Sequence, residues 1–484
     1  MVKKRIIVVV CVITFGLTSY GQVQIGNDID GEMAGDGAGF GTSLSSDGSI
    51  VAVGANFNAG GGAASGHVRV FENINGNWLQ IGSDIDGDPG DQSGQSVCLS
   101  ADGTILAVGE PIDNDVAASS GQVRVYENIG GTWTQIGSEI NGDIFNAQTG
   151  RGLDISADGS IVVAGAFGAN SFTGVVRVYE NQGGTWVQIG NDLNGDETLD
   201  LYGYSVSISD DGSIVATGAI GNPSSQEIGY VKIVENVGGN WSQIGNNIVG
   251  AATGYGTSVS LSSNGSIVAI GGPGDSPEGK VQVFQNVGGN WVQIGSDLLG
   301  ETSGDLFGSS VSLSADGNTL AVSARNNSSS ATNAGRTYIF RNQGGTWVQI
   351  GSPMDGEAAD DFSGRNIHLS SDASTVSIGT PANDGNGTSS GHVRVYDLTA
   401  LYVSLNELDN FAVIRLFPNP TEDYCKIEME DQLMFDGVSI YDASGKIVLT
   451  SKQTHIDLQH LPAGKYVVKI VTQKGDFSRN LTIH

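Results

Sequence analysis

Cysteine and basic residues are both scarce in this chain. Three of its 484 residues are cysteine, and Cys11 falls in an N-terminal apolar run. The other two, Cys98 and Cys425, lie far apart, so a disulfide framework is not the stabilising device. Lysine and arginine number 22 against 52 acidic residues. The net charge of -30 excludes nucleic acid as a partner, because binding a phosphate backbone needs clustered positive charge.

Long apolar runs are also scarce. Residues 6–17 form such a run, but it is too short to span a bilayer comfortably, and it follows basic residues at 3–5. Small residues precede a cut after Gly21. This pattern predicts a secretory signal peptide over residues 1–21 and a mature protein without a transmembrane segment.

Tryptophan, by contrast, recurs at regular intervals. The six tryptophans are separated by 55, 53, 55, 50 and 56 residues, each two residues before a Gln-Ile-Gly. A seventh Gln-Ile-Gly, at 24–26, stands alone near the start. A period of about 50 residues with a fixed aromatic position predicts a radial array of β-sheets, one per repeat. The six positions are Trp78, Trp133, Trp186, Trp241, Trp291 and Trp347.

Each repeat contains four β-strand patterns separated by turn residues. The first alternates apolar and small residues and ends in an Asp-Gly or Asn-Gly turn, where glycine supplies the positive φ of a tight hairpin. The second, as at 50–54, is almost wholly apolar and is the expected core strand. The third reads Gly-His-Val-Arg-Val or a variant, and the fourth carries the tryptophan. The seventh turn reads Asp372-Ala373, so we expect strain or a different turn there.

Counting these patterns predicts how the array closes. Seven hairpins and seven third strands occur, but the last repeat ends at Asp397 without a fourth strand, which the isolated segment 23–26 can supply. We therefore expect an all-β fold. A seven-bladed β-propeller over residues 22–398, closed by the N-terminal strand, is followed by a linker over 399–412 and a small β-sandwich over 413–484.

The C-terminal segment differs from the repeats. Residues 22–400 contain two lysines, whereas residues 401–484 contain six. Phe-Pro-Asn-Pro at 417–420, Tyr-Asp-x-x-Gly-Lys at 441–446 and Leu-Pro-x-Gly-x-Tyr at 461–466 follow in that order. From about residue 414 onward the sequence resembles the type A C-terminal sorting domain of the type IX secretion system. The resemblance implies contact with that secretion machinery and export across the outer membrane of a Bacteroidetes-type bacterium. It places the protein in the medium or on the outer cell surface, often with removal of this domain.

The repeats resemble the FG-GAP class. An aromatic-Gly pair opens the first strand in four repeats, whereas Ser93, Thr149 and Ser363 replace the aromatic in the others. The integrin version of this class holds calcium in a long loop between its first two strands. That connection is a short hairpin in this chain, so we do not expect that calcium site. The four pairs begin at Phe40, Tyr202, Tyr255 and Phe307.

Acidic residues concentrate where one repeat joins the next. Acids or amides with the spacing i, i+2, i+4 and i+8 recur after the Gln-Ile-Gly at 28–36 and 192–200, and the copy at 84–91 nearly matches this spacing. Alternate residues of an extended segment face one way, so their oxygens could hold a hard cation such as calcium. The alternative is solvated Asx turns, which form without metal. The copy with Val249 and Ala251 in place of acids favours this alternative. The candidate ligands are Asp28, Asp30, Glu32, Asp36, Asp84, Asp86, Asp88, Asp91, Asp192, Asn194, Asp196 and Asp200.

Other repeated residues are better explained as scaffold. Six equivalent tryptophans around a ring cannot converge on one ligand, so we expect packing between blades rather than sugar stacking. The third-strand arginines, such as Arg69, are expected to be structural partners of the acidic segments or to lie on a solvated face. His67 and His392 share a repeat position that holds glutamine, valine or tyrosine elsewhere, which indicates a variable surface site.

Motifs for catalysis are absent from the sequence, including the nucleophile elbow, the paired-histidine zinc motif and the phosphate loop. We expect a secreted or cell-surface binding or adhesion module for an extracellular glycan or protein, using variable loops at the rim. The alternative is an extracellular enzyme that processes polysaccharide or peptide at the propeller face. An enzyme should concentrate non-repeated His, Tyr, Arg or acidic residues at one face. The sequence shows no such concentration, so no catalytic residue is assigned.

Overall fold

The computed structural model describes residues 21–221, 228–402, 414–417, 421, 423–429, 435–442, 446–472 and 475–483. The chain divides into two compact units between Thr399 and Ala400. Residues 1–20 of the predicted signal peptide, most of the predicted linker and the prolines of the Phe-Pro-Asn-Pro motif lie outside the described residues. Among the described residues, no helix combines the length and the apolar composition needed to cross a membrane.

The strands of the first unit fall into five classes by position. The innermost strands are β3 (Ala38–Leu44), β8 (Ser96–Leu99), β13 (Gly152–Ile155), β18 (Tyr202–Ile208), β23 (Ser258–Leu261), β28 (Phe307–Leu313) and β32 (Ile367–Leu369). The second strands are β4 (Ile50–Ala55), β9 (Ile105–Glu110), β14 (Ile161–Ala166), β19 (Ile214–Ala219), β24 (Ile267–Gly272), β29 (Thr319–Ala324) and β33 (Thr375–Thr380). The third strands are β5 (His67–Ile74), β10 (Gln122–Ile129), β15 (Val175–Asn181), β20 (Tyr230–Val237), β25 (Lys280–Val287), β30 (Arg336–Gln343) and β34 (His392–Asp397). The fourth strands are β6 (Asn77–Gln80), β11 (Thr132–Gln135), β16 (Trp186–Gln188), β21 (Asn240–Gln243), β26 (Asn290–Gln293), β31 (Thr346–Asp355) and β1 (Val23–Gln24). Short fifth strands are β2 (Ile29–Asp30), β7 (Ile85–Asp86), β12 (Ile140–Asn141), β17 (Leu193–Asn194), β22 (Ile248–Val249) and β27 (Leu298–Leu299), and the helix α1 spans Ala169–Phe172.

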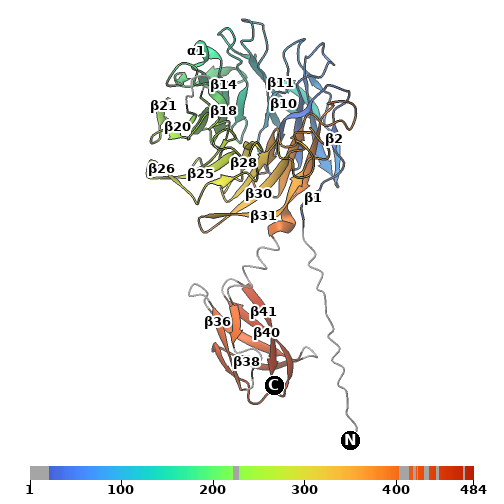
Figure 1. Cartoon of the computed structure of the whole chain (residues 1–484), viewed down its shortest axis with the longest axis vertical. Coiled ribbons are helices and arrows are strands. Elements are labelled where there is room, and N and C mark those ends of the chain that lie inside the picture. Colours follow the sequence, from blue (N-terminus) through green and yellow to red (C-terminus); the bar gives the residue numbers. More distant parts are fainter. Residues whose placement is uncertain are drawn as a thin grey trace. The chain divides into compact units, whose positions relative to one another are not determined.

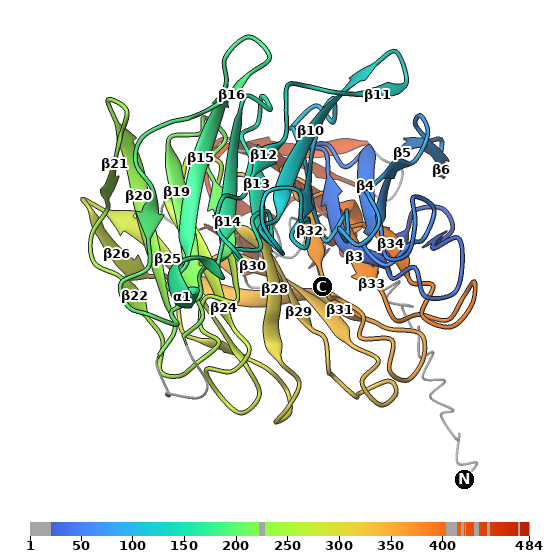
Figure 2. The same ribbon diagram turned by 90° about the horizontal axis from the view of Figure 1, so that it is seen from above.

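These strands form seven antiparallel sheets within the described residues of the first unit. The sheets follow one another around a circle in chain order (Figures 1 and 2). In Figure 2 the first sheet, in blue, lies beside the last, in orange, where β3 contacts β32 and β33. The all-β fold predicted from the sequence is confirmed.

The N-terminal strand belongs to the last sheet. Val23 pairs with Asp397 and Gln24 with Tyr396, so β1 lies antiparallel to β34. The short strand β2 continues along β34, with Ile29 opposite Val393. These are the strand partners that the isolated Gln-Ile-Gly predicts.

The tryptophans join neighbouring sheets. Nε1 of Trp78 donates a hydrogen bond to the carbonyl oxygen of Ile25 at 2.8 Å, and four other tryptophans make the same bond to the preceding Gln-Ile-Gly. Trp347 differs, because its buried Nε1 has no partner within the described residues. Gln22 stands at the tryptophan position of the N-terminal strand, and its Nε2 donates to the carbonyl oxygen of Ser352 at 2.6 Å.

Glycine allows the second strand of one sheet to approach the start of the innermost strand of the next sheet closely. A Cβ on Gly54 would lie 1.9 Å from the carbonyl oxygen of Gly94, and five more glycine pairs make this contact at 2.0 to 2.2 Å. In the remaining pair, Ser323 faces Gly364. Backbone therefore packs on backbone where adjacent sheets meet near the centre of the unit.

Side chains hold the Asp-Gly turns in place. Oδ1 of Asp47 accepts hydrogen bonds from the Ser45 hydroxyl at 2.8 Å and from the Ser49 amide at 2.9 Å. Oγ of Ser45 in turn accepts from the amide of Ile50 at 3.0 Å. The Ser-x-Asp-Gly sequence thus specifies both ends of the hairpin.

The seventh turn has the same hydrogen bonds without the glycine. Asp372 accepts from the Ser370 hydroxyl and the Ser374 amide at 2.8 and 2.9 Å. Ala373 occupies the glycine position with a φ of 61°. Of the two expectations, strain is therefore the one that applies.

The second unit consists of two sheets that share one hydrophobic core. Cys425 and Ile456 from one sheet pack with Ile440 and Val468 from the other. This arrangement is the small β-sandwich expected from the sequence. One sheet contains β35 (Ile414–Phe417), β36 (Tyr424–Met429) and β39 (His455–Asp457), and the other contains β37 (Phe435–Tyr441), β38 (Ile447–Ser451), β40 (Gly464–Thr472) and β41 (Gly475–Ile483).

Replacing Ala373 with glycine should stabilise the protein by up to about 1 kcal/mol. A left-handed conformation costs a non-glycine residue roughly 1–2 kcal/mol, and the gain is offset in part by the greater freedom of glycine in the unfolded chain. Denaturant unfolding measures the change. The converse substitution Gly317→Ala should destabilise, because its Cβ would lie 2.6 Å from the Ile267 side chain. An unchanged or lower stability of Ala373→Gly would contradict the strain.

Candidate functional site

A central channel, with a cavity volume of about 330 Å³, is lined by the innermost strands of all seven sheets. In each sheet, the residue that comes directly after the contact glycine lines the channel, and these seven residues form a ring. Unlike the rest of the repeat, these positions differ strongly from sheet to sheet. This entrance ring consists of Phe40, Gln95, Arg151, Tyr204, Thr257, Ser309 and Arg365.

The entrance ring corrects the alignment of the aromatic-Gly pairs. Ala38 bridges to the third strand of the preceding sheet as Phe307 does. The equivalent of Phe307-Gly308 in the first repeat is therefore Ala38-Gly39 and not Phe40-Gly41. Phe40 is one residue further along and faces the channel.

Arginine and aromatic side chains meet at this end of the channel. Arg151 donates from Nη2 to the Tyr204 hydroxyl at 3.2 Å, and its guanidinium lies 5.3 Å from the centre of the tyrosine ring. The guanidinium of Arg365 lies 4.6 Å from the centre of the Phe40 ring. Arg325, which follows β29, is near enough to act electrostatically on both Tyr204 and Arg365.

Arg151 and Arg325 change the ionisation of Arg365 and Tyr204. Burial, followed by repulsion from Arg151 and Arg325, lowers the pKa of Arg365 to about 10. Burial alone would raise the pKa of Tyr204, but the three arginines, led by Arg151, lower it below its usual value. None of the three forms an ion pair with a carboxylate in the described part of the chain. The channel entrance is thus a local excess of positive charge.

The expectation that no non-repeated polar residues concentrate at one face is therefore wrong. Arg151 and Arg365 belong to different repeats and come together only because the sheets form a ring. The sequence does hold a signal, which is the residue after the contact glycine in each repeat. The shifted alignment at Phe40 hides it.

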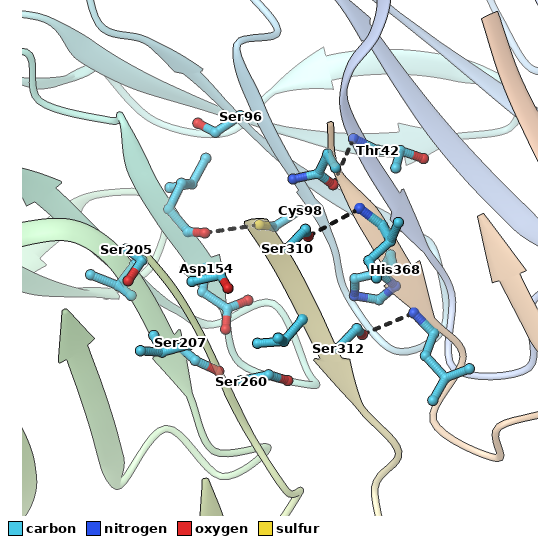
Figure 3. Close-up of a pocket in the computed structure, with 18 of the residues that line it drawn as sticks. Thr42, Ser96, Cys98, Asp154, Ser205, Ser207, Ser260, Ser310, Ser312 and His368 are labelled. Carbon is cyan, nitrogen blue, oxygen red and sulfur yellow. Dashed lines mark hydrogen bonds between the residues drawn. The ribbon is translucent and has the colours of Figure 1, made fainter. Parts of the chain in front are cut away.

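A second ring, three residues further along each strand, connects the innermost strands (Figure 3). Oγ of Ser207 accepts a hydrogen bond from the amide of Leu261 at 3.1 Å, and serine makes the same bond at three other junctions. Nδ1 of His368 accepts from the amide of Leu44 at 3.1 Å and so links the last sheet to the first. This inner ring consists of Ser43, Cys98, Asp154, Ser207, Ser260, Ser312 and His368.

Asp154 compensates for Cys98 in the inner ring. The Cys98 thiol donates to the carbonyl oxygen of Leu153 at 3.2 Å and so accepts no amide. Asp154 accepts the amides of both Ile155 and Ile208 at 2.9 Å. Burial raises the pKa of Asp154 to about 6 and lowers that of His368 to about 4. Both titratable side chains therefore accept hydrogen bonds from backbone amides.

The acidic segments lie at the junctions between sheets and do not line the channel. Their first acid accepts a hydrogen bond from the glutamine of the preceding Gln-Ile-Gly, as Asp28, Asp84 and Asp192 do at 2.6 to 2.8 Å. Their second member lies on a short fifth strand, opposite the start of the third strand. The exposed second members are Asp30, Asp86 and Asn194.

The third acid of each segment contacts a basic residue of the next sheet. Glu32 lies 3.8 Å from Arg69, and Asp196 lies 2.7 Å from Lys232. Asp88 is an exception, because Arg124 binds the buried Glu110 of its own sheet instead. The repeated basic residues are thus structural partners of the acidic segments, as one of the two expectations states.

The fourth acid caps the segment. Asp36 accepts two successive backbone amides at 2.9 and 2.8 Å, and Asp200 does the same. Asp275, from a neighbouring loop, takes this role in the copy that lacks acids. Burial, followed by nearby acids, raises the pKa of Asp91 to about 7, and its buried Oδ2 has no partner among the described residues. The proposed ligands thus mostly bind protein groups at several separate junctions, and the calcium site stays a prediction.

Family comparisons agree with both resemblances. The model of the secretion system C-terminal sorting domain matches residues 415–484. The C-terminal segment is a type IX sorting domain. The protein is therefore exported to the cell surface or the extracellular space. The model of the FG-GAP repeat matches residues 300–340. No curated protein matches the chain significantly.

Solved structures with a related fold are distant in sequence. A putative 6-phosphogluconolactonase from Bacteroides uniformis is 12% identical, with a TM-score of 0.46, covering 66% of this chain and 86% of that chain. The periplasmic gluconolactonase of Pseudomonas aeruginosa is 13% identical, with a TM-score of 0.46, covering 87% and 95%. These likenesses are too low to assign an activity.

A hydrogen-bonded turn forms at the Leu-Pro-x-Gly-x-Tyr motif of the sorting domain. The Tyr466 hydroxyl donates to the carbonyl oxygen of Pro462 at 2.6 Å. The Tyr466 ring belongs to the hydrophobic core. One side chain thus fills the core and fixes the turn, which accounts for tyrosine in the motif.

Replacing His368 with serine should make the protein less sensitive to acid. Burial lowers the pKa of His368 from 6.5 to about 4, so protonation favours the unfolded chain and stability falls as the pH drops through this window. The loss reaches about 3 kcal/mol, at 1.36 kcal/mol for each pKa unit. Serine keeps an acceptor for the Leu44 amide and removes the loss.

The measurement is the free energy of unfolding of both proteins between pH 7 and pH 4. Asp154, whose pKa is raised, contributes the opposite slope in the same window, but it is present in both proteins. Equal pH slopes in the two proteins would contradict the assignment.

Proposed function

We propose that this exported protein is a non-catalytic binding module whose entrance ring holds an anionic group of an extracellular glycan. The observation that carries the proposal is the cluster of Arg151, Arg325 and Arg365 without a carboxylate partner in the described residues. Elsewhere in the propeller, basic side chains such as Arg177 and Arg336 are paired with acids of two segments.

Repulsion within the cluster favours an anion. The lowered pKa of Arg365 reflects burial and the cost of holding it beside two other cations. A bound carboxylate or sulfate relieves that cost and accepts paired N–H donors from a guanidinium group. In a chain with a net charge of -30, this local excess of positive charge supports selective binding of an anion at the entrance.

Two further features support a sugar rather than a small inorganic anion. Phe40 and Tyr204 alternate with the arginines around the entrance and offer flat apolar faces for a pyranose ring. Oε1 of Gln95 and Nε of Arg325 are buried without a hydrogen-bond partner among the described residues. Buried polar atoms are usually satisfied, so these two favour a ligand that brings both donors and acceptors.

The enzyme alternative has two observations in its favour, the concentration of non-repeated Arg and Tyr residues at the channel entrance and the lowered pKa of Tyr204 beside Arg151. A hydrolase acting on glycans typically needs two carboxyl groups that flank the bond. Asp154 and His368 line the channel but bind backbone amides. Binding without catalysis is therefore the better supported function.

Neutralising the entrance arginines should weaken binding of an anionic glycan. In calorimetric titrations with an oligouronate, Arg151→Gln and Arg365→Gln should each lower the affinity about tenfold or more. A hydrogen bond to a charged group contributes about 1.5–3 kcal/mol, and about 1.4 kcal/mol corresponds to a factor of ten. A neutral oligosaccharide of equal length should bind weakly to all variants.

Arg177→Gln is the matched control, because it removes the same charge from an arginine that pairs with Asp143 and Asp192 outside the channel. A similar loss in this control would show general attraction to the protein and contradict an entrance site. Failure of the wild-type protein to bind the oligouronate would also contradict it. Cleavage of the oligouronate, lost in Tyr204→Phe, would support the enzyme alternative.

A further inference from the structure

Two equivalent histidines are buried at junctions between sheets. His67 begins β5 and His392 begins β34, and their relative exposures are 0% and 1%. This burial corrects the expectation of a variable surface site. No ring nitrogen of either histidine makes a hydrogen bond of good geometry within the described residues, although Nδ1 of His392 lies 3.3 Å from Oδ2 of Asp28 and Nδ1 of His67 lies 3.8 Å from Oδ2 of Asp84. Buried polar atoms are rarely left in this state. Nε2 of each imidazole lacks a partner, and Nδ1 of each faces a carboxylate without a well-formed hydrogen bond.

Each histidine faces two carboxylates from two different segments. One carboxylate comes from the acidic segment that precedes the innermost strand of the histidine's sheet. The other comes from the acidic segment that follows the fourth strand of the same sheet. The candidate ligand atoms of each cluster lie within 4.8 Å of one another. The His67 cluster is Glu32, His67 and Asp84, and the His392 cluster is Glu357, His392 and Asp28.

We propose that each cluster binds one divalent transition-metal ion of the zinc class. One imidazole nitrogen and two carboxylate oxygens are ligands that zinc takes at about 2.1 Å, with water in the fourth position. In a tetrahedral site with metal–ligand bonds of about 2.1 Å, the ligand atoms lie about 3.4 Å from one another. The side chains of each cluster must therefore move roughly 1 Å closer together to bind the ion. The exposed side chains of Glu32 and Glu357 have room to move. Calcium fits less well, because it prefers six to eight oxygen ligands.

An arginine is the competing cation at each cluster. Arg69 lies 3.8 Å from Glu32, and Arg394 lies 3.4 Å from Glu357. Both arginines also donate to a backbone carbonyl of the acidic segment, so they are held without the carboxylate. Two carboxylates and one guanidinium leave a net charge of -1 beside each imidazole. The cluster therefore still attracts a divalent cation.

The other junctions show what occupies this place when histidine is absent. Arg336 stands at the histidine position of its sheet and pairs with Glu301 and Asp355. The Tyr230 hydroxyl donates to Asp200 at 2.8 Å. Those side chains satisfy the acids directly. A protonated histidine could act as Arg336 does, which is the competing explanation to be tested.

Both clusters include a carboxylate from residues 28–32, the segment that follows β1 and passes between the last and first sheets. That strand pairs over two residues, and Gln22 replaces the tryptophan of other repeats. Metal ions in the two clusters would tie this segment to the sheets on both sides. The proposed sites thus lie on either side of the N-terminal segment that completes the last sheet.

The test is calorimetric titration of Zn²⁺ into the untagged mature protein. We expect two sites per chain in the wild type, one in His67→Gln, one in His392→Gln and none in the double variant. Glutamine is the natural residue of the second sheet, at Gln122, so both substitutions should fold. Retention of the other site in each single variant confirms folding in the same experiment.

Thermal unfolding provides the second readout. Zn²⁺ should raise the melting temperature of the wild type and leave that of the double variant unchanged, and Co²⁺ should show the visible absorption of a nitrogen-ligated ion. Equal zinc binding by the wild type and the double variant overturns the proposal. So does a wild type that binds no zinc and is stabilised by protonation of the histidines, which would assign ion pairs instead.

Discussion

The first unit depends on the inner ring of hydrogen bonds between side chains and the backbone. Innermost strands belong to different sheets, so they do not pair with one another, and each exposes an edge of N–H groups toward the channel. A short side chain on one strand binds the amide of the next, and His368 carries the series back to Leu44. Serine suits most positions because it is small and accepts a hydrogen bond. Since the ring fixes neighbouring strands, it also fixes the entrance residues three positions earlier.

Departures from the repeat are usually compensated nearby. Cys98 accepts no amide, and Asp154 accepts two. One acidic segment lacks its capping acid, and Asp275 caps it from another loop. The hydrogen bond at a repeat position is therefore kept even where the usual residue is replaced, because a residue nearby supplies it. Where a departure leaves polar groups without a partner, as at Arg325 and His67, the missing partner is best sought outside the chain.

The fold could be predicted because its repeated residues report local chemistry. Tryptophan, Gln-Ile-Gly and the Asp-Gly turns specify contacts that recur in each sheet, and the unpaired 23–26 segment indicates where the N-terminus pairs. The entrance ring could not be predicted in the same way, because Arg151 and Arg365 meet only in the closed ring. The burial of His67 also depends on another repeat, since the segment containing Glu32 covers it. Alternation along one strand cannot show that both of its faces are covered.

Some residues that depart from the repeat bind backbone groups of a neighbouring sheet, and others do not. This difference separates residues that support the fold from residues that could serve a function. Where the first and last sheets meet, Gln22 binds the carbonyl of Ser352, and Asn386 donates to the carbonyl of Gly31 at 2.8 Å. Both contacts hold backbone across a connection that spans nearly the whole propeller in sequence, where loop closure costs the most entropy. At the entrance, the described contacts of the Arg151 and Arg365 side chains are with aromatic rings and hold no backbone. Loss of those arginines would leave the ring of sheets intact, so their presence is better explained by a ligand than by the fold.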